Sequence, residues 1–375
     1  MGHQVIVIPS LKPDARLAGL VTDIREEFVR SGADAPEVVI VNDGSDASYD
    51  HFFEDAAANG ATVLTHEVNR GKGAALKTAV RYIREHYGTE YGMITADADG
   101  QHLPKDILRV ALDMEAHPEA LVMGSREFGE GTPWKSLFGN RCTSFFFRIT
   151  TGRSCRDTQT GLRGIPASLM QLAAEVEGDR YEYEMNFLMD AALVAPFHTT
   201  TIETVYFDDN KGSHFHPVRD AVRVYGRFLR FLLASTGGFL VDILMFMLFL
   251  RLFTASGVAA EGAIGGSDGP TALLFGMSLK WESIVIILST VLARICSGIV
   301  NFLLNKHYAF RSKQKAAGEA GRYLVLFIGL MAASALFTSA ISSITHLPTP
   351  TKIVVDVVLF LASYRIQRAW VFRKT

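Results

Sequence analysis

Cysteine is scarce in this chain, which has only three among its 375 residues. Cys142, Cys155 and Cys296 are too few and too scattered for a disulfide framework or a cysteine-based zinc site, and this favours a reducing compartment. Neither sign of charge is in excess, because 37 Lys and Arg stand against 39 Asp and Glu. We therefore expect no nucleic-acid partner.

A long apolar run is missing from the N-terminus, where "MGHQVIVIPS" has only a few apolar residues before Pro9. We expect a first strand there and not a signal peptide. Further strands are expected at "EVVIVND", "TVLTHE", "YGMITAD" and "ALVMGSR", separated by amphipathic stretches such as 14–31 and 72–87. This alternation predicts an α/β, Rossmann-like domain over 1–212, with a mostly parallel sheet covered by helices.

Long apolar segments are present after residue 227, at about 228–250, 283–305, 323–344 and 352–372. Each is close to the roughly 20 residues that cross a bilayer, so they predict an all-α, four-helix transmembrane domain over 231–375. Their length and the basic clusters at one set of their ends disfavour a buried bundle in a soluble protein. By the positive-inside rule, the first domain and both termini are cytoplasmic in a multi-pass protein of the cell membrane, and 254–282 and 345–351 are outside. The basic clusters are Arg223, Arg227 and Arg230; Lys306, Arg311, Lys313, Lys315 and Arg322; and Arg373 and Lys374.

The stretch "MITADADGQH" ends a predicted buried strand with two carboxylates. Asp97 and Asp99 are two positions apart and so point to one face, with Gln101 close behind. Carboxylate and amide oxygens are the ligands that Mg²⁺ and Mn²⁺ prefer. The sequence therefore predicts a metal site at Asp97, Asp99 and Gln101, completed by a substrate diphosphate. The alternative is a surface turn whose carboxylates lie beside a glycine.

Two earlier motifs suit a nucleotide. "VNDGSD" places Asp43 at the end of the second strand, where its carboxylate can accept hydrogen bonds from a base or ribose, although Asn-Asp-Gly is also an ordinary turn. In "NRGKGAALKTAV", Gly71 and Lys72 stand at a helix start, where backbone N–H groups and the helix dipole favour an anion. The Walker pattern G-x-x-x-x-G-K-[ST] is absent from the sequence, which removes the main support for an ATPase.

Two arginines further along suit phosphate oxygens. Arg126 ends the strand "VMGSR" and Arg141 lies in "FGNR", and both guanidiniums can bind phosphate through two hydrogen bonds. The polar turn "CRDTQTGLRG" follows and contains Asp157 and Gln159.

The segment 213–230 joins the two halves and carries arginines at helical spacing. They are Arg219, Arg223, Arg227 and Arg230. The spacing predicts an interfacial helix at the membrane surface, and a basic flank that only fixes topology is an equal alternative. Ser213 and His214 in the same segment, together with Arg219, suit an anionic, lipid-borne substrate.

Taken in order, these motifs resemble the family 2 glycosyltransferases of the polyprenyl-phosphate sugar synthase type. The resemblance covers roughly residues 3–225 and rests on "VIPS", "VNDGSD", "NRGKGAALKTA", "DADGQH", "GSR", "GNR", "RDTQTGLRG" and "NKGSHF". It implies a GT-A fold and inverting, metal-dependent transfer of one sugar from a UDP-hexose or GDP-mannose to polyprenyl phosphate on the cytoplasmic face. Related membrane transferases often assemble, so a homo-oligomer is compatible with it.

The resemblance also implies residue roles. Asp97, Asp99 and Gln101 would place Mg²⁺ or Mn²⁺ on the donor diphosphate, and Asp157 would orient the arginines or the sugar more than act as a base. The implied catalytic residues are Asp97, Asp99, Asp157, Arg126 and Arg141. The implied donor-binding residues are Pro9, Asp43, Gly71, Lys72, Asp97 and Gln159. The implied acceptor-phosphate residues are Arg126, Arg141, Ser213, His214 and Arg219.

The second half resembles a GtrA-type module through "RFLLASTGGFLVDILMF", "ARICSGIVNFLLNKHYAF" and "YRIQRAWVFR". Its connection 254–282 is longer than usual, and "IGGSDGPTALL" within it is similar to a stretch of sodium-pumping decarboxylases, too short to carry that function. Charges inside spans are costly, so we expect Arg294 to pair with Asp242 or Asp356. The module either holds the bundle together in this way or binds and helps to move the glycolipid.

Three other functions stay open at this point. A nucleotidyltransferase also uses an α/β fold and metal, but "DTQTGLRG" beside a membrane helix has no purpose there. A processive polysaccharide synthase should carry Q-x-x-R-W, and "QRAWVF" has the wrong spacing. A flippase-type membrane protein would not need the metal and phosphate motifs.

Overall fold

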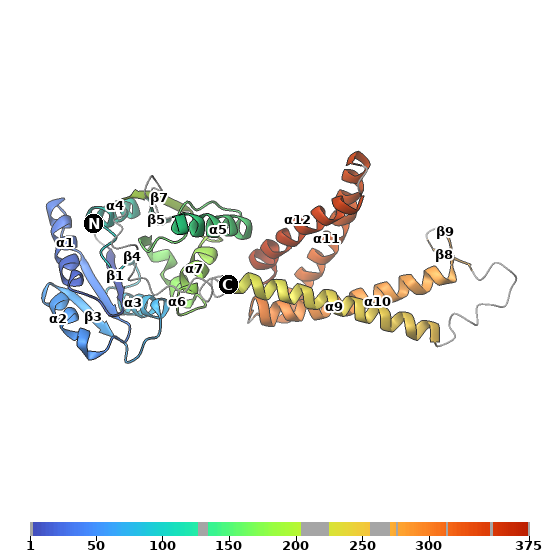
Figure 1. Cartoon of the computed structure of the whole chain (residues 1–375), viewed down its shortest axis with the longest axis horizontal. Helices are drawn as coiled ribbons and strands as arrows, with labels where there is room; N and C mark the ends of the chain where they lie inside the picture. The colour runs from blue at the N-terminus through green and yellow to red at the C-terminus, as the bar shows by residue number, and fades with distance from the viewer. Residues whose placement is uncertain are drawn as a thin grey trace. The chain divides into compact units, whose positions relative to one another are not determined.

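The computed structural model describes residues 3–126, 134–203, 225–255, 271–274, 277–312, 314–345 and 348–373 (Figure 1). They divide into two compact units, Met1–Val224 and Tyr225–Thr375. Most of the predicted interfacial helix at 213–230, including Ser213, His214 and Arg219, lies outside the described residues. The proposed domain limits therefore stay predictions.

The first unit is built on a seven-stranded sheet in the order β3-β2-β1-β4-β6-β5-β7. The strands are β1 (Gln4–Ser10), β2 (Glu37–Asn42), β3 (Ala61–Thr65), β4 (Gly92–Thr95), β5 (Leu121–Arg126), β6 (Arg163–Ile165) and β7 (Phe197–Ile202). Neighbours are parallel except at β6, which runs antiparallel to both β4 and β5. The predicted α/β class and mostly parallel sheet are thus confirmed.

Helices cover both faces of this sheet. They are α1 (Arg16–Arg30), α2 (Asp50–Ala58), α3 (Lys72–His86), α4 (Pro104–Ala116), α5 (Trp134–Thr151), α6 (Ala167–Glu175) and α7 (Glu182–Ala191). Val5 and Val7 of β1 pack in one apolar cluster with α3, α6 and α7, whereas Ile6 and Ile8 pack in the other with α1, α2 and α4. Burial on both faces explains why β1 reads as a continuous apolar run. Loops after the parallel strands meet at one edge, where α/β proteins bind their ligands.

The second unit is helical, with α9 (Gly226–Ala255) beside α10 (Trp281–Leu304) and α11 (Ala316–Thr345) beside α12 (Pro348–Ile366) (Figure 1). Two short strands, β8 (Thr271–Leu274) and β9 (Met277–Lys280), pair within the connection before α10. Among the described helices, Phe228–Phe253 and Ala316–Ser334 are long and apolar enough to cross a membrane. A membrane unit is thereby supported, while the number of four spans stays a prediction.

The two helix pairs repeat each other in sequence and structure. "GRFL" begins α9 and "GRYL" recurs early in α11, while "NKHYAFR" after α10 matches "QRAWVFR" after α12. Each matching segment forms one turn of π-helix, at Asn305–Ala309 and Gln367–Val371. Of the two partners predicted for Arg294, the structure has Asp242, at 3.5 Å and within the first repeat.

Each repeat packs one aromatic ring, at the equivalent position, against two rings of the other repeat. The ring of Phe302 in the first repeat lies 5.4 Å from that of Tyr323 and 5.9 Å from that of Phe372 in the second. Tyr364, the counterpart of Phe302, lies at the same distances of 5.4 and 5.9 Å from the matching rings of the first repeat. Those rings are Phe228 and Phe310. The repeats are therefore related by an approximate twofold axis.

We expect Phe302→Ala and Tyr364→Ala to destabilise the membrane unit to a similar extent, by about 3 kcal/mol each, because each removes a buried ring that joins the repeats. Thermal unfolding of the purified chain in detergent measures this. Ile344→Ala is the control, since that side chain is 80% exposed on α11. Clearly unequal losses for the two variants would contradict the twofold arrangement.

Candidate functional site

Asp97 lies directly beyond β4, at the edge where the loops of the first unit meet. Its backbone N–H donates to Nδ1 of His102 at 3.0 Å, and its Oδ1 accepts from the ammonium of Lys72 at 2.7 Å. Gly161 comes so close that a Cβ there would lie 2.1 Å from Oδ2 of Asp97. The carboxylate can therefore occupy this place only because residue 161 has no side chain.

Lys72 is the first residue of α3, and its ammonium contacts two carboxylates. Its Nζ lies 2.7 Å from Oδ1 of Asp97 and 3.1 Å from Oε1 of Glu184. Burial alone lowers the pKa of Lys72, but the two carboxylates outweigh it and the net pKa is raised. Burial likewise raises the pKa of Asp97, but the charge and hydrogen bond of Lys72, together with the charges of His102 and Arg163, outweigh it, so the net pKa of Asp97 is lowered. Both groups are charged at neutral pH.

Asp99 lies near this pair, in the turn beyond β4, and is exposed. Its Oδ1 accepts from the backbone N–H of Gln101 at 3.0 Å. Desolvation by the surrounding protein, followed by the negative charge of Asp97, raises the pKa of Asp99. A bound cation would offset both the desolvation and the repulsion from Asp97 that raise this pKa. The two carboxylates, whose oxygens are hard donors, therefore fit Mg²⁺ or Mn²⁺. In the part of the chain that the structure describes, no three His, Cys, Asp or Glu side chains form a metal site by themselves, so substrate oxygens would have to complete the shell.

Asp43 is buried beneath the loop that precedes α3. Its Oδ1 accepts from the backbone N–H of Arg70 at 2.9 Å and its Oδ2 from that of Gly71 at 2.7 Å. His66 adds a contact of 2.8 Å to Oδ1 and reaches Thr78 Oγ1 at 3.0 Å through its other nitrogen. These two N–H groups thus hold a carboxylate of the protein, in place of the substrate anion expected there. Asp43 is placed to support the loop that carries Lys72.

Close packing of two helix starts brings Glu184 to Lys72. A Cβ on Gly71 would lie 2.3 Å from the carbonyl oxygen of Asp179, and one on Gly73 would lie 2.5 Å from Cβ of Tyr183. The start of α3 and the start of α7 can therefore touch. Neither Glu184 nor His66 was predicted as a site residue, because only this packing joins them to the motifs.

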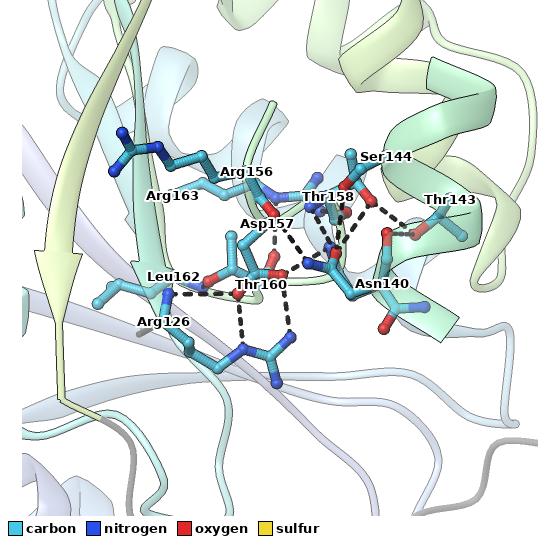
Figure 2. Close-up of polar contacts among 11 residues, drawn as sticks. Arg126, Asn140, Thr143, Ser144, Arg156, Asp157, Thr158, Thr160, Leu162 and Arg163 are labelled. Carbon is cyan, nitrogen blue, oxygen red and sulfur yellow. Dashed lines mark hydrogen bonds and ion pairs between the residues drawn. The ribbon is translucent and has the colours of Figure 1, made fainter. Parts of the chain in front are cut away.

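Arg126 and Asp157 form a second pair, in which two N–H groups of the guanidinium face the two carboxylate oxygens (Figure 2). The distances are 2.6 Å from Nε to Oδ2 and 2.9 Å from Nη2 to Oδ1. Asn140 of α5 fixes the turn around Asp157, donating to the carbonyl of Arg156 at 2.7 Å and accepting from the N–H of Thr158 at 3.2 Å. Asp157 is thus placed to orient Arg126.

One histidine shows that the two clusters share a region. The pKa of His102 is lowered, mainly by burial, and the charges of Asp97, Asp99, Lys72 and Arg126 all act on it. Nδ1 of His102 accepts a hydrogen bond, which a neutral ring allows. The carboxylates after β4 and the guanidinium at the end of β5 are therefore close enough to act on one neutral ring.

Three other predicted residues take little part in these contacts, although the backbone N–H of Gln159 donates to Oδ1 of Asp157 at 3.2 Å. Arg141 is exposed on α5, one residue after the buried Asn140, and Gln159 is exposed in the turn after Asp157. Pro9 lies within β1, opposite Val41 of β2. Their predicted contacts with substrate stay predictions.

Both halves of the chain match known families. Residues 5–170 match the model of glycosyl transferase family 2. Residues 270–372 match the model of the GtrA/DPMS transmembrane domain.

Individual relatives cover parts of the chain. An uncharacterized protein of Methanocaldococcus jannaschii is 27% identical over 189 residues, which are 49% of this chain and 73% of that protein. A UDP-N-acetylglucosamine–dolichyl-phosphate N-acetylglucosaminyltransferase of Methanococcus voltae is 34% identical over 125 residues, which are 32% of this chain and 49% of that protein. The chain thus spans about half the length of the second relative.

Among solved structures, glucosyl-3-phosphoglycerate synthase of Mycobacterium tuberculosis in complex with Mn²⁺, UDP and phosphoglyceric acid has a TM-score of 0.43 and 14% identity. The match covers 75% of this chain and 87% of that one.

Proposed function

We propose, from the premise that this chain is a family 2 glycosyltransferase of GT-A fold joined to a GtrA/DPMS transmembrane domain, that it transfers one sugar to a lipid phosphate. The donor is a nucleotide-diphosphate sugar, and the acceptor is polyprenyl phosphate. The Methanococcus voltae relative, whose name includes dolichyl phosphate, supports this class of acceptor. The basic clusters beside the membrane helices support a catalytic domain and both termini on the cytoplasmic side.

The observation that carries the proposal is the arrangement of charge around His102. Asp97 and Asp99 supply negative charge near this ring, and Lys72 and Arg126 supply positive charge. A transfer between two phosphate compounds needs both a cation site for the leaving diphosphate and a guanidinium for the incoming phosphate. We assign the carboxylates and Lys72 to the donor, and Arg126 to the acceptor.

Asp97 and Asp99 would hold Mg²⁺ or Mn²⁺, with Gln101 close by. When bound, the ion would offset the negative charge that develops on the leaving nucleotide diphosphate. Lys72 adds a positive charge at the start of α3, 2.7 Å from Oδ1 of Asp97.

A phosphate oxygen of the acceptor attacks the anomeric carbon, and the bond from that carbon to the diphosphate oxygen breaks, with its electron pair leaving on the nucleotide. Attack opposite the leaving group inverts the anomeric configuration. A phosphate monoester has a second pKa of about 6, so its oxygen is already ionised at neutral pH and needs no general base. Asp157 is therefore not needed as a base, and both of its oxygens already accept hydrogen bonds from Arg126.

The test is transfer by the purified full chain in detergent, supplied with undecaprenyl phosphate, Mn²⁺ and a panel of radiolabelled UDP- and GDP-sugars. We expect label from one donor to enter the organic phase, and EDTA to abolish it. Label that appears without undecaprenyl phosphate, or no label from any donor, would contradict the proposal.

A further inference from the structure

Lys72 has two carboxylate partners that come from different parts of the fold. Asp97 belongs to the loop after β4, which is the proposed metal site, whereas Glu184 belongs to α7. The ammonium carries three protons and contacts both groups, at 2.7 and 3.1 Å. The side chains of Lys72 and Glu184 are only 21% and 18% exposed, so water screens the pair little.

Glu184 is held in place by contacts that do not involve Lys72. Its backbone carbonyl accepts from Nη1 of the buried Arg163 at 3.1 Å, and Nε of Arg163 donates to the carbonyl of Thr160 at 3.0 Å. The neighbouring Tyr183 is buried, and its hydroxyl donates to the carbonyl of Ala173 at 2.8 Å. These contacts fix the backbone at Glu184, and its carboxylate also lies 3.9 Å from Nη2 of Arg163, so it is an anchor that does not depend on Lys72.

A cation that binds Asp97 competes with the ammonium already there. Lys72 occupies Oδ1 of Asp97 at hydrogen-bond distance, and like charges so close repel each other. The ammonium must therefore loosen its contact with Asp97 when a divalent ion arrives. Glu184 offers it a second carboxylate within reach, at 3.1 Å.

We propose, building on the proposed function, that Glu184 is a positioning residue that retains Lys72 while the metal ion and donor diphosphate take over Asp97. Lys72 contacts both carboxylates in the structure, and its ammonium would move toward Glu184 and the diphosphate when the metal ion and donor bind. Glu184 touches no reacting atom in this scheme and acts through Lys72.

The test is binding of Mn²⁺ to the purified full chain, measured from the EPR signal of free Mn²⁺ with and without UDP or GDP. We expect Glu184→Gln to weaken Mn²⁺ binding about tenfold, because Lys72 then has only Asp97 as a partner. Lys72→Met should tighten Mn²⁺ binding in the absence of nucleotide, since the competing ammonium is gone. In the Lys72→Met background, Glu184→Gln should change the Mn²⁺ affinity less than threefold.

Asp179→Asn is the matched control. This carboxylate lies at the same helix junction but pairs with Lys77, at 2.9 Å, and should leave Mn²⁺ binding unchanged. An equal loss of affinity from Glu184→Gln in both backgrounds would overturn the proposal, because Glu184 would then act through its own charge or through the fold. Unchanged affinity in Glu184→Gln, or no Mn²⁺ binding by the wild type, would also overturn it.

The two proposals fail in different ways. If Mn²⁺ affinity depends on Glu184 only when Lys72 is present, but no sugar is transferred to undecaprenyl phosphate, the positioning role of Glu184 is supported and the proposed acceptor is rejected. If sugar is transferred but Mn²⁺ affinity does not depend on Glu184, the proposed function is supported and the positioning role of Glu184 is rejected.

Discussion

Asp99→Asn is expected to lower sugar transfer on the order of 10³-fold while the protein stays folded in the membrane. The substitution removes a charged oxygen of the proposed metal site, and the leaving diphosphate loses its counter-charge. Steady-state transfer by the purified variant at saturating Mn²⁺ measures the loss. Asp55→Asn, on the exposed side of α2, is the control and should leave the rate unchanged. Near-normal turnover in Asp99→Asn would remove Asp99 from the site.

The same residue predicts a dependence on pH. Desolvation and then Asp97 raise the pKa of Asp99, so its carboxyl becomes protonated at a higher pH than an ordinary aspartate as the solution is acidified. Transfer should therefore fall as pH drops through this raised pKa. Higher Mn²⁺ concentration should shift the fall to lower pH, because the ion binds only the ionised form.

Asp157→Ala is expected to cause the second large loss. It leaves the Arg126 guanidinium, only 16% exposed, without the carboxylate that holds it by two hydrogen bonds. Breaking such a buried pair costs about 3 kcal/mol or more, and the guanidinium loses its orientation. We expect the KM for undecaprenyl phosphate to rise at least about tenfold and kcat to fall on the order of 10², while the KM for the donor stays the same.

Arg126→Ala provides the matched comparison. If the two residues act as one unit, the double variant should be no worse than either single variant. Additive losses, or a change in donor KM alone, would contradict the assignment of this pair to the acceptor. Thermal unfolding of all three variants shows which part of the loss is structural.

Local patterns predicted the strands whose sequences are apolar runs, and they failed where tertiary context decides. β1 to β5 are apolar runs, and all five were expected. β6 has only three residues, and β7 reads "FHTTTI", whose threonines carry little apolar signal. β6 is a strand because it lies between β4 and β5, and β7 is a strand because it pairs with β5, which no local pattern reveals.

The site divides in the same way. Asp97 and Asp99 were predictable from their residue types after an apolar strand, but both lie in the turn beyond β4, so the strand alternation used to predict a common face does not apply to them. Glu184 was not, since it reaches Lys72 only through the contact of α3 with α7 at Gly71 and Gly73. The sequence also could not show that Asp43 occupies the N–H groups of the loop before α3.

The membrane repeats are an intermediate case. The likeness of "NKHYAFR" to "QRAWVFR" is visible in the sequence and was missed. The packing of Phe302 and Tyr364 against the rings of the opposite repeat is visible only in the structure.

The central claim is that the lipid phosphate itself attacks the sugar. The most direct measurement is transfer with undecaprenyl phosphate whose phosphate oxygens are ¹⁸O, followed by mass spectrometry of the product and NMR of its anomeric carbon. The account predicts that every ¹⁸O atom is retained, with one of them bridging to the sugar, and that the anomeric configuration is inverted. Loss of ¹⁸O from the lipid product, or retained configuration, would contradict it.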